Sequence, residues 1–158
     1  MKRILVLFIM VAILLSGCAG NSQFKVGEKM SEINNKHTPY ISINSLNAYE
    51  SSGNYFIVIG TEGVAEKLVE FSSERQSIRA QGLNLVKSQD INKFLNMDIN
   101  KLKKELGQPH VDVGSGFYIP AYITDDAYLI CFELEDDIVF EVIKRDLLTN
   151  DIIARVNN

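Results

Sequence analysis

His110 and Asp112 are the residues whose types most directly suggest the edge of a metal site or an acid–base pair. They stand close together in the chain, just after the Gly107-Gln-Pro109 sequence that ends a predicted helix. The only other histidine in the sequence is His37, so no set of histidines and cysteines has zinc-binding spacing. We therefore expect polar loop residues here, with neither a metal nor a cofactor.

Glu133 and Glu141 are acidic residues on two predicted neighbouring strands, and paired carboxylates of this kind catalyse glycoside hydrolysis. Together with Asp112 they would suit a hydrolase of cell-wall material. Nothing in the sequence predicts a cleft between them, and a water-exposed sheet face explains them more simply. The chain is therefore predicted not to be an enzyme, and the hydrolase stays as an alternative.

Two other polar clusters lack the spacing that their chemistry needs. The acidic turns at Asp125-Asp126 and Glu135-Asp136-Asp137 do not alternate oxygen ligands as a calcium-binding EF-hand loop does. Gly114-Ser115-Gly116 has neither the strand-turn-helix setting of a nucleophile elbow nor the lysine of a phosphate-binding loop. We expect solvated hairpin turns and a flexible glycine corner.

Cys18 carries the clearest chemical signal, which is covalent attachment of lipid. Residues 1–17 have a basic start at Lys2 and Arg3, followed by an apolar run that is short for a membrane span. The run ends in Leu15-Ser-Gly-Cys18, which resembles the lipobox of bacterial lipoproteins. In such proteins the signal peptide is removed, and the cysteine is acylated and becomes the new amino terminus. The sequence thus predicts a signal peptide over residues 1–17 and acyl chains, such as palmitate, on Cys18.

The mature chain is predicted to be lipid-anchored to a bacterial cell membrane or outer membrane, facing outside the cytoplasm. Residues 18–26 form a polar tether and residues 27–158 a single domain. Without Lys2 and Arg3, 14 basic residues remain against 20 acidic ones, a net charge of −6. Because no cluster of cations is interleaved with aromatics, nucleic acid is excluded as a partner.

Residues 88–144 give the strongest secondary-structure signals. Ser88 begins a short helix that ends near Asn96, and Asp98 caps a second helix over residues 99–106. Three strands follow, with connections too short for parallel crossovers, at 117–124, 128–134 and 138–144. The predicted fold class is α+β, a helix pair packed on an antiparallel β-meander.

An internal comparison divides the domain into two halves. Tyr55 followed by Thr61 mirrors Tyr118 followed by Thr124, at an offset of 63 residues. A helix-forming stretch precedes each pair. This pattern suggests two degenerate helix-plus-hairpin repeats, residues 27–86 and 87–158.

The predicted sheet leaves an apolar group on the face turned away from the helices. Its members are Tyr118, Tyr122, Leu129 and Val139. One interpretation is that residues 26–86 cover this group, which is then the core between the two halves. The other is an exposed surface for a protein partner, since tyrosine is enriched at binding hot spots.

The run from Phe94 to Pro109 resembles the helix pair of the SmpA/OmlA small lipoproteins, also described as BamE-like. The matching residues are Met97, Leu106, Gly107 and Pro109. Asn96 stands where that pattern usually has glycine, and Asp98 where it has threonine or serine. The resemblance implies the fold of β-lactamase inhibitor proteins and a role in assembly or inhibition through a sheet surface.

The function predicted from these features is that of a membrane-anchored envelope lipoprotein that acts as a protein-interaction module. It would contact the membrane through the lipid on Cys18 and bind another envelope protein. Two alternatives stay open, a cell-wall-directed hydrolase and a solute-binding or sensory lipoprotein.

Overall fold

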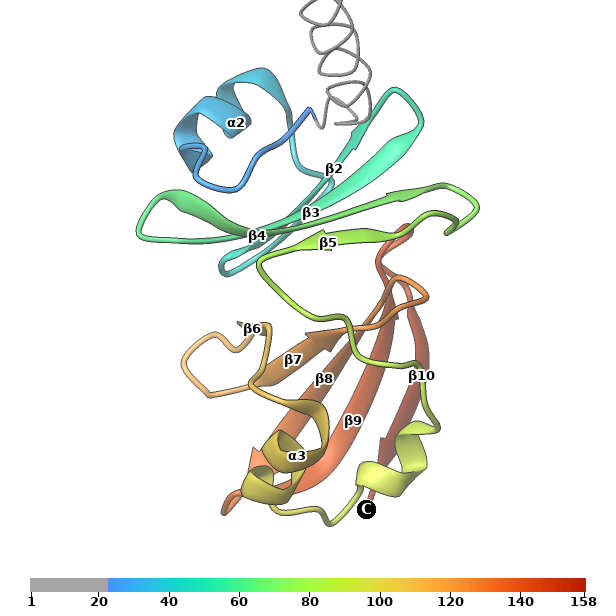
Figure 1. Ribbon diagram of the computed structural model, residues 1–158. Coiled ribbons are helices and arrows are strands. Elements are labelled where there is room, and N and C mark those ends of the chain that lie inside the picture. Colours follow the sequence, from blue (N-terminus) through green and yellow to red (C-terminus); the bar gives the residue numbers. More distant parts are fainter. Residues whose placement is uncertain (1–22) are drawn as a thin grey trace, which may run out of the picture.

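Strands dominate the computed structural model, which describes residues 23–158 (Figure 1). They make up 46% of these residues and form two antiparallel sheets. In chain order the elements are α2 (Met30–Lys36), β1 (Ile41–Ile43), β2 (Leu46–Ser51), β3 (Asn54–Thr61), β4 (Val64–Ser72), β5 (Arg79–Gln81), the 3₁₀ turn η1 (Ile91–Phe94), α3 (Ile99–Leu106), β6 (Val111–Asp112), β7 (Pro120–Ile123), β8 (Tyr128–Glu135), β9 (Ile138–Asp146) and β10 (Ile152–Asn157).

Each half of the chain forms one five-stranded sheet by running back and forth. Sheet 1 has the order β1-β2-β3-β4-β5, and sheet 2 has the order β10-β9-β8-β7-β6. Consecutive strands are neighbours in both sheets, as the short connections require. The first half therefore consists of α2 and sheet 1, and the second half consists of η1, α3 and sheet 2.

The predicted α+β fold, a helix pair on a meander, is wrong. Helix accounts for only 14% of the described residues. The first predicted helix is the single turn η1, which is capped by Asp90 rather than by Ser88. The loose alternation near residue 41 predicts one edge strand, but Asn44 takes a left-handed φ of 49° and divides this stretch into the hairpin of β1 and β2.

The strongest local signals do correspond to the structure. The carboxylate of Asp98 accepts hydrogen bonds from the N–H groups of Asn100 and Lys101 and so caps α3. Gly107, at φ 84°, ends the same helix. The three strands predicted after it are adjacent and antiparallel, as β7, β8 and β9.

The two sheets contribute side chains to one shared core, and each helix covers the other face of its own sheet (Figure 1). The core under α2 contains Phe24, Ile33, Tyr49, Phe56, Val58, Ala65 and Leu68. The core between the sheets contains Ile41, Leu46, Ala48, Ile57, Ile59, Val69, Phe71, Val111, Ala121, Ile123, Ala127, Leu129, Cys131, Ile143 and Leu147. The core under η1 and α3 contains Val86, Ile91, Phe94, Met97, Ile99, Leu102, Tyr122, Ile130, Phe132, Val139 and Val142. Successive side chains of one strand point to opposite faces of the sheet, and they therefore belong to different cores.

The folded part begins before residue 27, where the predicted tether ends. Phe24 is only 1% exposed. Its ring centroid lies 4.5 Å from that of Phe56 and 4.8 Å from that of His37. The predicted tether over residues 18–26 is therefore too long, because a large aromatic within it belongs to the core under α2.

The same backbone hydrogen bonds attach the two helical segments to their sheets. In the first half the N–H of Gly27 donates to the carbonyl oxygen of Ala65 at 2.8 Å, and in the second half Asn96 donates to Val139 at 2.9 Å. Equivalent positions are therefore 69 residues apart before the helices and 74 apart in the sheets. The predicted offset of 63 is wrong, and the shared unit is a helix with five strands rather than a helix with a hairpin.

A β-bulge at the equivalent place in each sheet changes which side chains face the helix. The register between β3 and β4 shifts at Gly60, and that between β8 and β9 shifts at Leu134. In β9 the shift brings Val139 into the core under α3, where unbroken alternation would place Phe140. Strict alternation from Val142 would turn Phe140 and Ile138 inward as well. The bulge excludes this arrangement, and Ile138 is 36% exposed.

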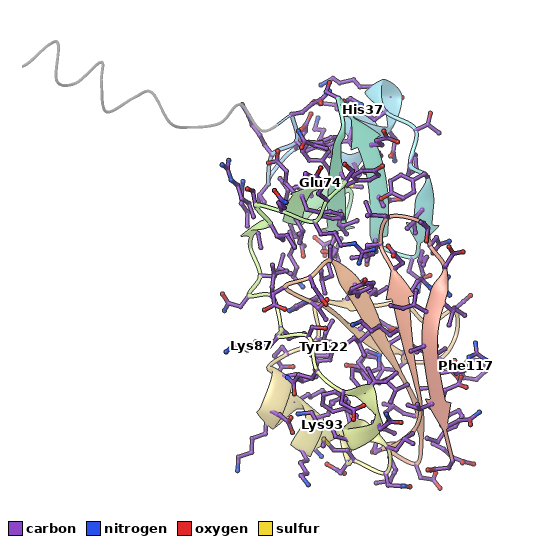
Figure 2. The ribbon with its side chains drawn as sticks, turned by 90° about the vertical axis from the view of Figure 1, so that its right-hand side faces the viewer. His37, Glu74, Lys87, Lys93, Phe117 and Tyr122 are labelled. Atoms are coloured by element: carbon purple, nitrogen blue, oxygen red, sulfur yellow. The ribbon has the colours of Figure 1, made fainter. Side chains whose placement is uncertain are left out.

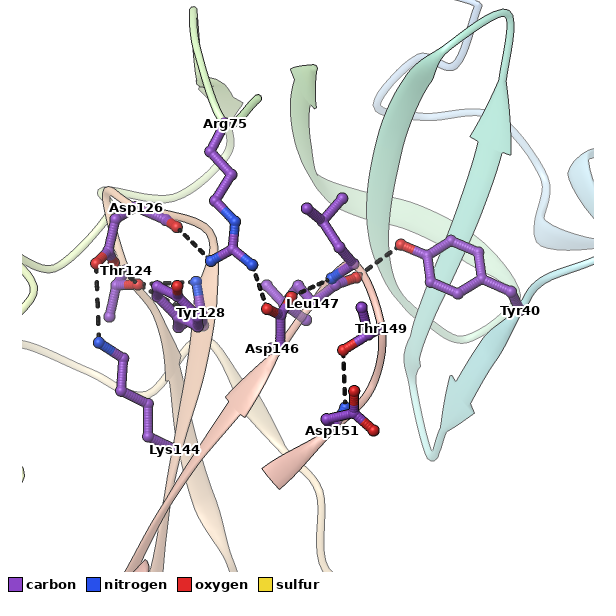
Figure 3. A network of polar contacts seen from close by, with 11 residues as sticks. Tyr40, Arg75, Thr124, Asp126, Tyr128, Lys144, Asp146, Leu147, Thr149 and Asp151 are labelled. Atoms are coloured by element: carbon purple, nitrogen blue, oxygen red, sulfur yellow. Dashed lines mark hydrogen bonds and ion pairs between the residues drawn. The ribbon is translucent and has the colours of Figure 1, made fainter. Parts of the chain in front are cut away.

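Polar contacts between the halves supplement the central core (Figure 3). Arg75, in the loop after β4, forms an ion pair with Asp146, and its guanidinium lies 4.1 Å from the ring centroid of Tyr128. The hydroxyl of Tyr40 donates to the carbonyl oxygen of Leu147 at 2.7 Å. Because each contact joins residues of different halves, together they fix how the two halves are oriented.

Candidate functional site

The four residues of the predicted partner surface do not form one surface. Tyr122, Leu129 and Val139 are each 0% exposed. Leu129 lies in the core between the sheets, whereas Tyr122 and Val139 lie under α3, on the opposite face of sheet 2. The interpretation that residues 26–86 cover this group therefore applies to Leu129 only. Tyr118 is the exposed member, at 45%.

Asp112 closes the loop that precedes β7. Its carboxylate oxygen Oδ1 accepts hydrogen bonds from the N–H groups of Gly114 and Ile119, both at 2.9 Å. A Cβ atom at Gly114 would lie 1.6 Å from the carbonyl oxygen of Phe117, so no other residue fits this position. The segment expected to be a flexible corner is thus a loop of defined shape.

Phe117 lies near the tip of this loop and is the most exposed large apolar side chain among residues 23–158, at 80%. It points away from sheet 2 at the side of the molecule (Figure 2). Beside it lies an apolar hollow of about 230 Å³. We call the apolar residues of this region the Phe117 surface, which comprises Phe117, Tyr118, Ile119, Leu134 and Phe140.

The hollow exists because two strands of sheet 2 differ in length. The ladder between β7 and β8 ends at the pair Ala121 and Cys131, although β8 continues to Glu135. Leu134 therefore has no β7 neighbour beside it. The bulge in β9 places Phe140 near the same end of the sheet, which adds a third ring to those of Phe117 and Tyr118.

The rim of the Phe117 surface is predominantly acidic. Glu133 lines the hollow. The turn after β8 exposes three further carboxylates, those of Glu135, Asp136 and Asp137. One cation lies close, since the ammonium of Lys103 is 5.6 Å from the ring centroid of Tyr118. An apolar side chain flanked by positive charges would complement this arrangement.

Tyr118 retains its proton at neutral pH. Partial burial and, to a lesser degree, the nearby Asp112 carboxylate raise the pKa of its hydroxyl above the ordinary value. The Phe117 surface therefore offers one neutral hydroxyl beside the apolar hollow, where it can donate a hydrogen bond to a partner.

The carboxylates considered for hydrolysis do not converge on one hollow. Glu133 and Glu141 are direct cross-strand partners on β8 and β9. Glu141 is only 8% exposed, and its carboxylate lies 3.7 Å from the guanidinium of Arg155. The carboxylate of Asp112 is engaged in closing its own loop. Of these three acids, only Glu133 lines the hollow beside Phe117.

His110 is a buried structural residue, 6% exposed. Its Nδ1 accepts a hydrogen bond from the N–H of Ile123 at 2.8 Å. Burial lowers the pKa of the imidazole to about 4; a hydrogen bond to the backbone of Asn84 opposes this shift, and the charge of Lys67 adds to it. The side chain is therefore neutral at physiological pH.

Within residues 23–158 no three His, Cys, Asp or Glu side chains are placed to hold a metal ion together. The acidic turn before β8 has structural partners instead. Asp125 accepts a hydrogen bond from the N–H of Ser88 at 2.9 Å, and Asp126 lies 3.7 Å from the ammonium of Lys144. These contacts join the turn to the segment before η1 and to β9.

Cys18 and the predicted signal peptide over residues 1–17 lie outside the described residues. In the described part of the chain, the helices are too short or too polar to cross a bilayer. The second cysteine, Cys131, is buried, and burial raises the pKa of its thiol to about 12. Its thiol is accordingly a core group rather than a reactive one.

Phe117 was not among the predicted surface residues because alternation placed it inside a strand. β7 begins only at Pro120, since the residues after Asp112 are used by the loop. The signal that would have located it is an aspartate followed closely by Gly114 and Gly116. Aspartate readily accepts hydrogen bonds from backbone N–H groups just after it, and glycine permits tight turns.

No protein-family model, curated protein or solved structure matches this chain. The likeness to the SmpA/OmlA small lipoproteins thus stays a prediction that rests on residues 94–109.

Proposed function

We propose that this protein is a lipid-anchored lipoprotein of the bacterial envelope that binds another envelope protein through the Phe117 surface. The observation that carries the proposal is the exposure of Phe117 on a loop of fixed shape. The acyl chains on Cys18 hold the protein at the membrane. No bond is made or broken in this role, so the loop and sheet need only be rigid.

The cost of exposing Phe117 supports a binding role. Burying a phenylalanine side chain contributes about 1.5–3 kcal/mol, and here that contribution is left unused. The carboxylate of Asp112 and the close packing at Gly114 also fix the backbone of the loop that carries Phe117. A loop backbone that is already ordered loses little conformational entropy when a partner covers it, which favours tight association.

Photo-crosslinking in intact envelopes tests where the partner binds. We would replace Phe117 by p-benzoylphenylalanine and identify the crosslinked protein by mass spectrometry. The matched control places the same crosslinker at Ile153, an exposed apolar position on β10 with 47% exposure. The proposal expects a crosslink to one protein from position 117 that is absent from position 153.

Binding to that protein, once purified, gives the quantitative test. Phe117→Ala should weaken the affinity about tenfold or more, which is about 1.4 kcal/mol. The melting temperature should be unchanged, because the side chain is 80% exposed. Ile153→Ala should leave the affinity as it is. Equal affinities for Phe117→Ala and the parent protein would remove the Phe117 surface from the interaction.

A further inference from the structure

The first aromatic of the described residues, Phe24, lies only a few residues after the predicted lipid attachment. Phe24 is packed in the core under α2, so the chain is fixed to the fold from that residue onward. Cys18 precedes it by six residue steps. Six steps span at most about 21 Å, however the chain runs between them. A lipid on Cys18 would therefore hold Phe24 within about that distance of the bilayer surface.

The described chain starts beside α2, at the end of the molecule opposite α3 (Figure 1). In Figure 2, His37 marks this α2 end, and Phe117 and Lys93 lie in the other half. A short connection at one end of an elongated molecule restricts which end approaches the membrane. It does not alone decide between an upright molecule and one that lies on its side.

Charge adds an independent preference, because the two halves differ strongly. Residues 23–86 contain six basic and seven acidic residues, a net charge of −1. Residues 87–158 contain eight basic and thirteen acidic residues, a net charge of −5. Bacterial bilayers that contain anionic lipids repel negative charge near their surface. The second half should therefore point away from the membrane.

The groups near the chain start suit a lipid headgroup layer. Lys25 and Val26 are exposed, and the side chain of Lys29 is 71% exposed. Val64 is exposed as well and bridges to Lys29 through the backbone. Cations with long aliphatic stems next to small apolar side chains can contact phosphates and the outer acyl boundary together.

We propose that the α2 end of the molecule faces the bilayer and contacts its headgroups, with the Phe117 surface held away from the membrane. This inference rests on the proposed lipid anchor at Cys18. It assigns the membrane to the first half and the protein partner to the second. The Phe117 surface is then free to meet a partner that also projects into the space outside the bilayer.

Fluorescence quenching by headgroup-labelled lipid tests this orientation. The acylated protein would be extracted and reconstituted in vesicles of phosphatidylethanolamine and phosphatidylglycerol that contain a nitroxide-headgroup lipid. A thiol-reactive fluorophore would be placed at Ser31→Cys in α2, or at its equivalent Asn100→Cys in α3, both exposed. A third variant, Phe117→Cys, reports on the Phe117 surface.

The expected result is quenching several-fold stronger at position 31 than at positions 100 and 117. Equal quenching at positions 31 and 100 would overturn the proposal. Equal quenching at positions 31 and 117 would also overturn it, because the molecule would then lie on its side with the Phe117 surface against lipid.

The parent protein separates a failure of the orientation from a failure of the anchor. It should take up no fluorophore, because Cys18 is acylated and Cys131 is buried. Labelling of the parent, together with its loss from the vesicles, would mean that Cys18 carries no lipid. Retention of the parent with equal quenching at all three positions would leave the anchor intact and overturn only the orientation.

Discussion

At the scale of single residues, His110 connects the stability of the fold to pH. Its imidazole accepts a backbone hydrogen bond from Ile123 and is buried between the loop after α3 and β7. A proton on Nδ1 would remove this acceptor and leave a charge in the interior. The pKa of His110 is lowered to about 4, against an ordinary value near 6.5, so protonation favours the unfolded chain.

Stability should therefore be lost on the acid side. The contribution of His110 should be complete above about pH 6.5 and should fall by about 3 kcal/mol as the pH drops toward 4. Urea unfolding across this range measures it. His110→Asn keeps a hydrogen-bond acceptor but cannot be protonated, so its stability should depend less on pH. An identical acid dependence in this variant and in the parent protein would contradict the assignment.

Residue types predicted part of the candidate site. Tyr118 was identified from the sequence and is exposed, but Tyr122 beside it is buried. Tyr118 lies in the loop closed by Asp112, before β7 begins, whereas Tyr122 pairs with Ile130 and faces the core under α3. Which backbone N–H groups a carboxylate binds depends on the folded path of the chain, so the exposure of Phe117 could not be obtained from alternation.

At the scale of elements, α3 packs on sheet 2 through Ile99 and Leu102, which are both buried in the core under η1 and α3. Helical spacing makes Leu102 and Leu106 equal candidates for the core. Leu102 is 0% exposed and lies in the core under α3, whereas Leu106 is only partly buried. Position along the helix decides this, because Leu106 belongs to its last residues.

Leu102→Ala should lower the free energy of unfolding by about 2–5 kcal/mol, since it leaves a cavity between helix and sheet. Leu106→Ala should have a clearly smaller effect, because solvent already reaches its side chain. Chemical denaturation of both variants measures the two losses under one set of conditions. Equal losses would show that the end of α3 is packed as tightly as its centre.

Capping residues and turn residues made α3 and the three strands after it predictable. The side-chain faces were not predictable, because each sheet contains a bulge. An extra residue in one strand reverses the alternation beyond it. The hydrophobic pattern of β9, in which Val139 and Phe140 are adjacent, fits either face equally well.

At the scale of the whole molecule, the two halves depend on each other. The core between the sheets takes buried residues from both, and neither half could cover its inner face alone. The ion pair of Arg75 with Asp146 adds a polar contact across the same boundary. Cooperative unfolding is expected when apolar surface is shared in this way.

Thermal unfolding should consequently show one transition, with equal calorimetric and van't Hoff enthalpies. Ile33→Ala damages only the core under α2 and gives a sharper test. It should lower the unfolding midpoint by the same amount for a fluorophore at position 31 and one at position 100. A midpoint that changes at position 31 alone would show that the halves unfold separately.

The division into two similar halves was visible in the sequence, but its offset was not. Few identical residues remain between the halves, and the loops differ in length, so the offset changes from 69 before the helices to 74 in the sheets. Tyr49 and Tyr122 occupy equivalent buried places, whereas the comparison of Tyr55 with Tyr118 pairs residues of different roles. Backbone hydrogen bonds reveal the equivalence because they persist when side chains diverge.

The helix over each outer sheet face has a consequence for how such a protein can evolve. In a solenoid every repeat leaves a face on which another can stack, so the array lengthens by duplication. Here the two sheets share one core, and α2 and α3 already cover their other faces. A third copy of the unit would therefore find no uncovered sheet face on which to stack. New specificity must therefore arise by changing loops such as residues 112–119, which can vary in sequence while the three cores stay intact.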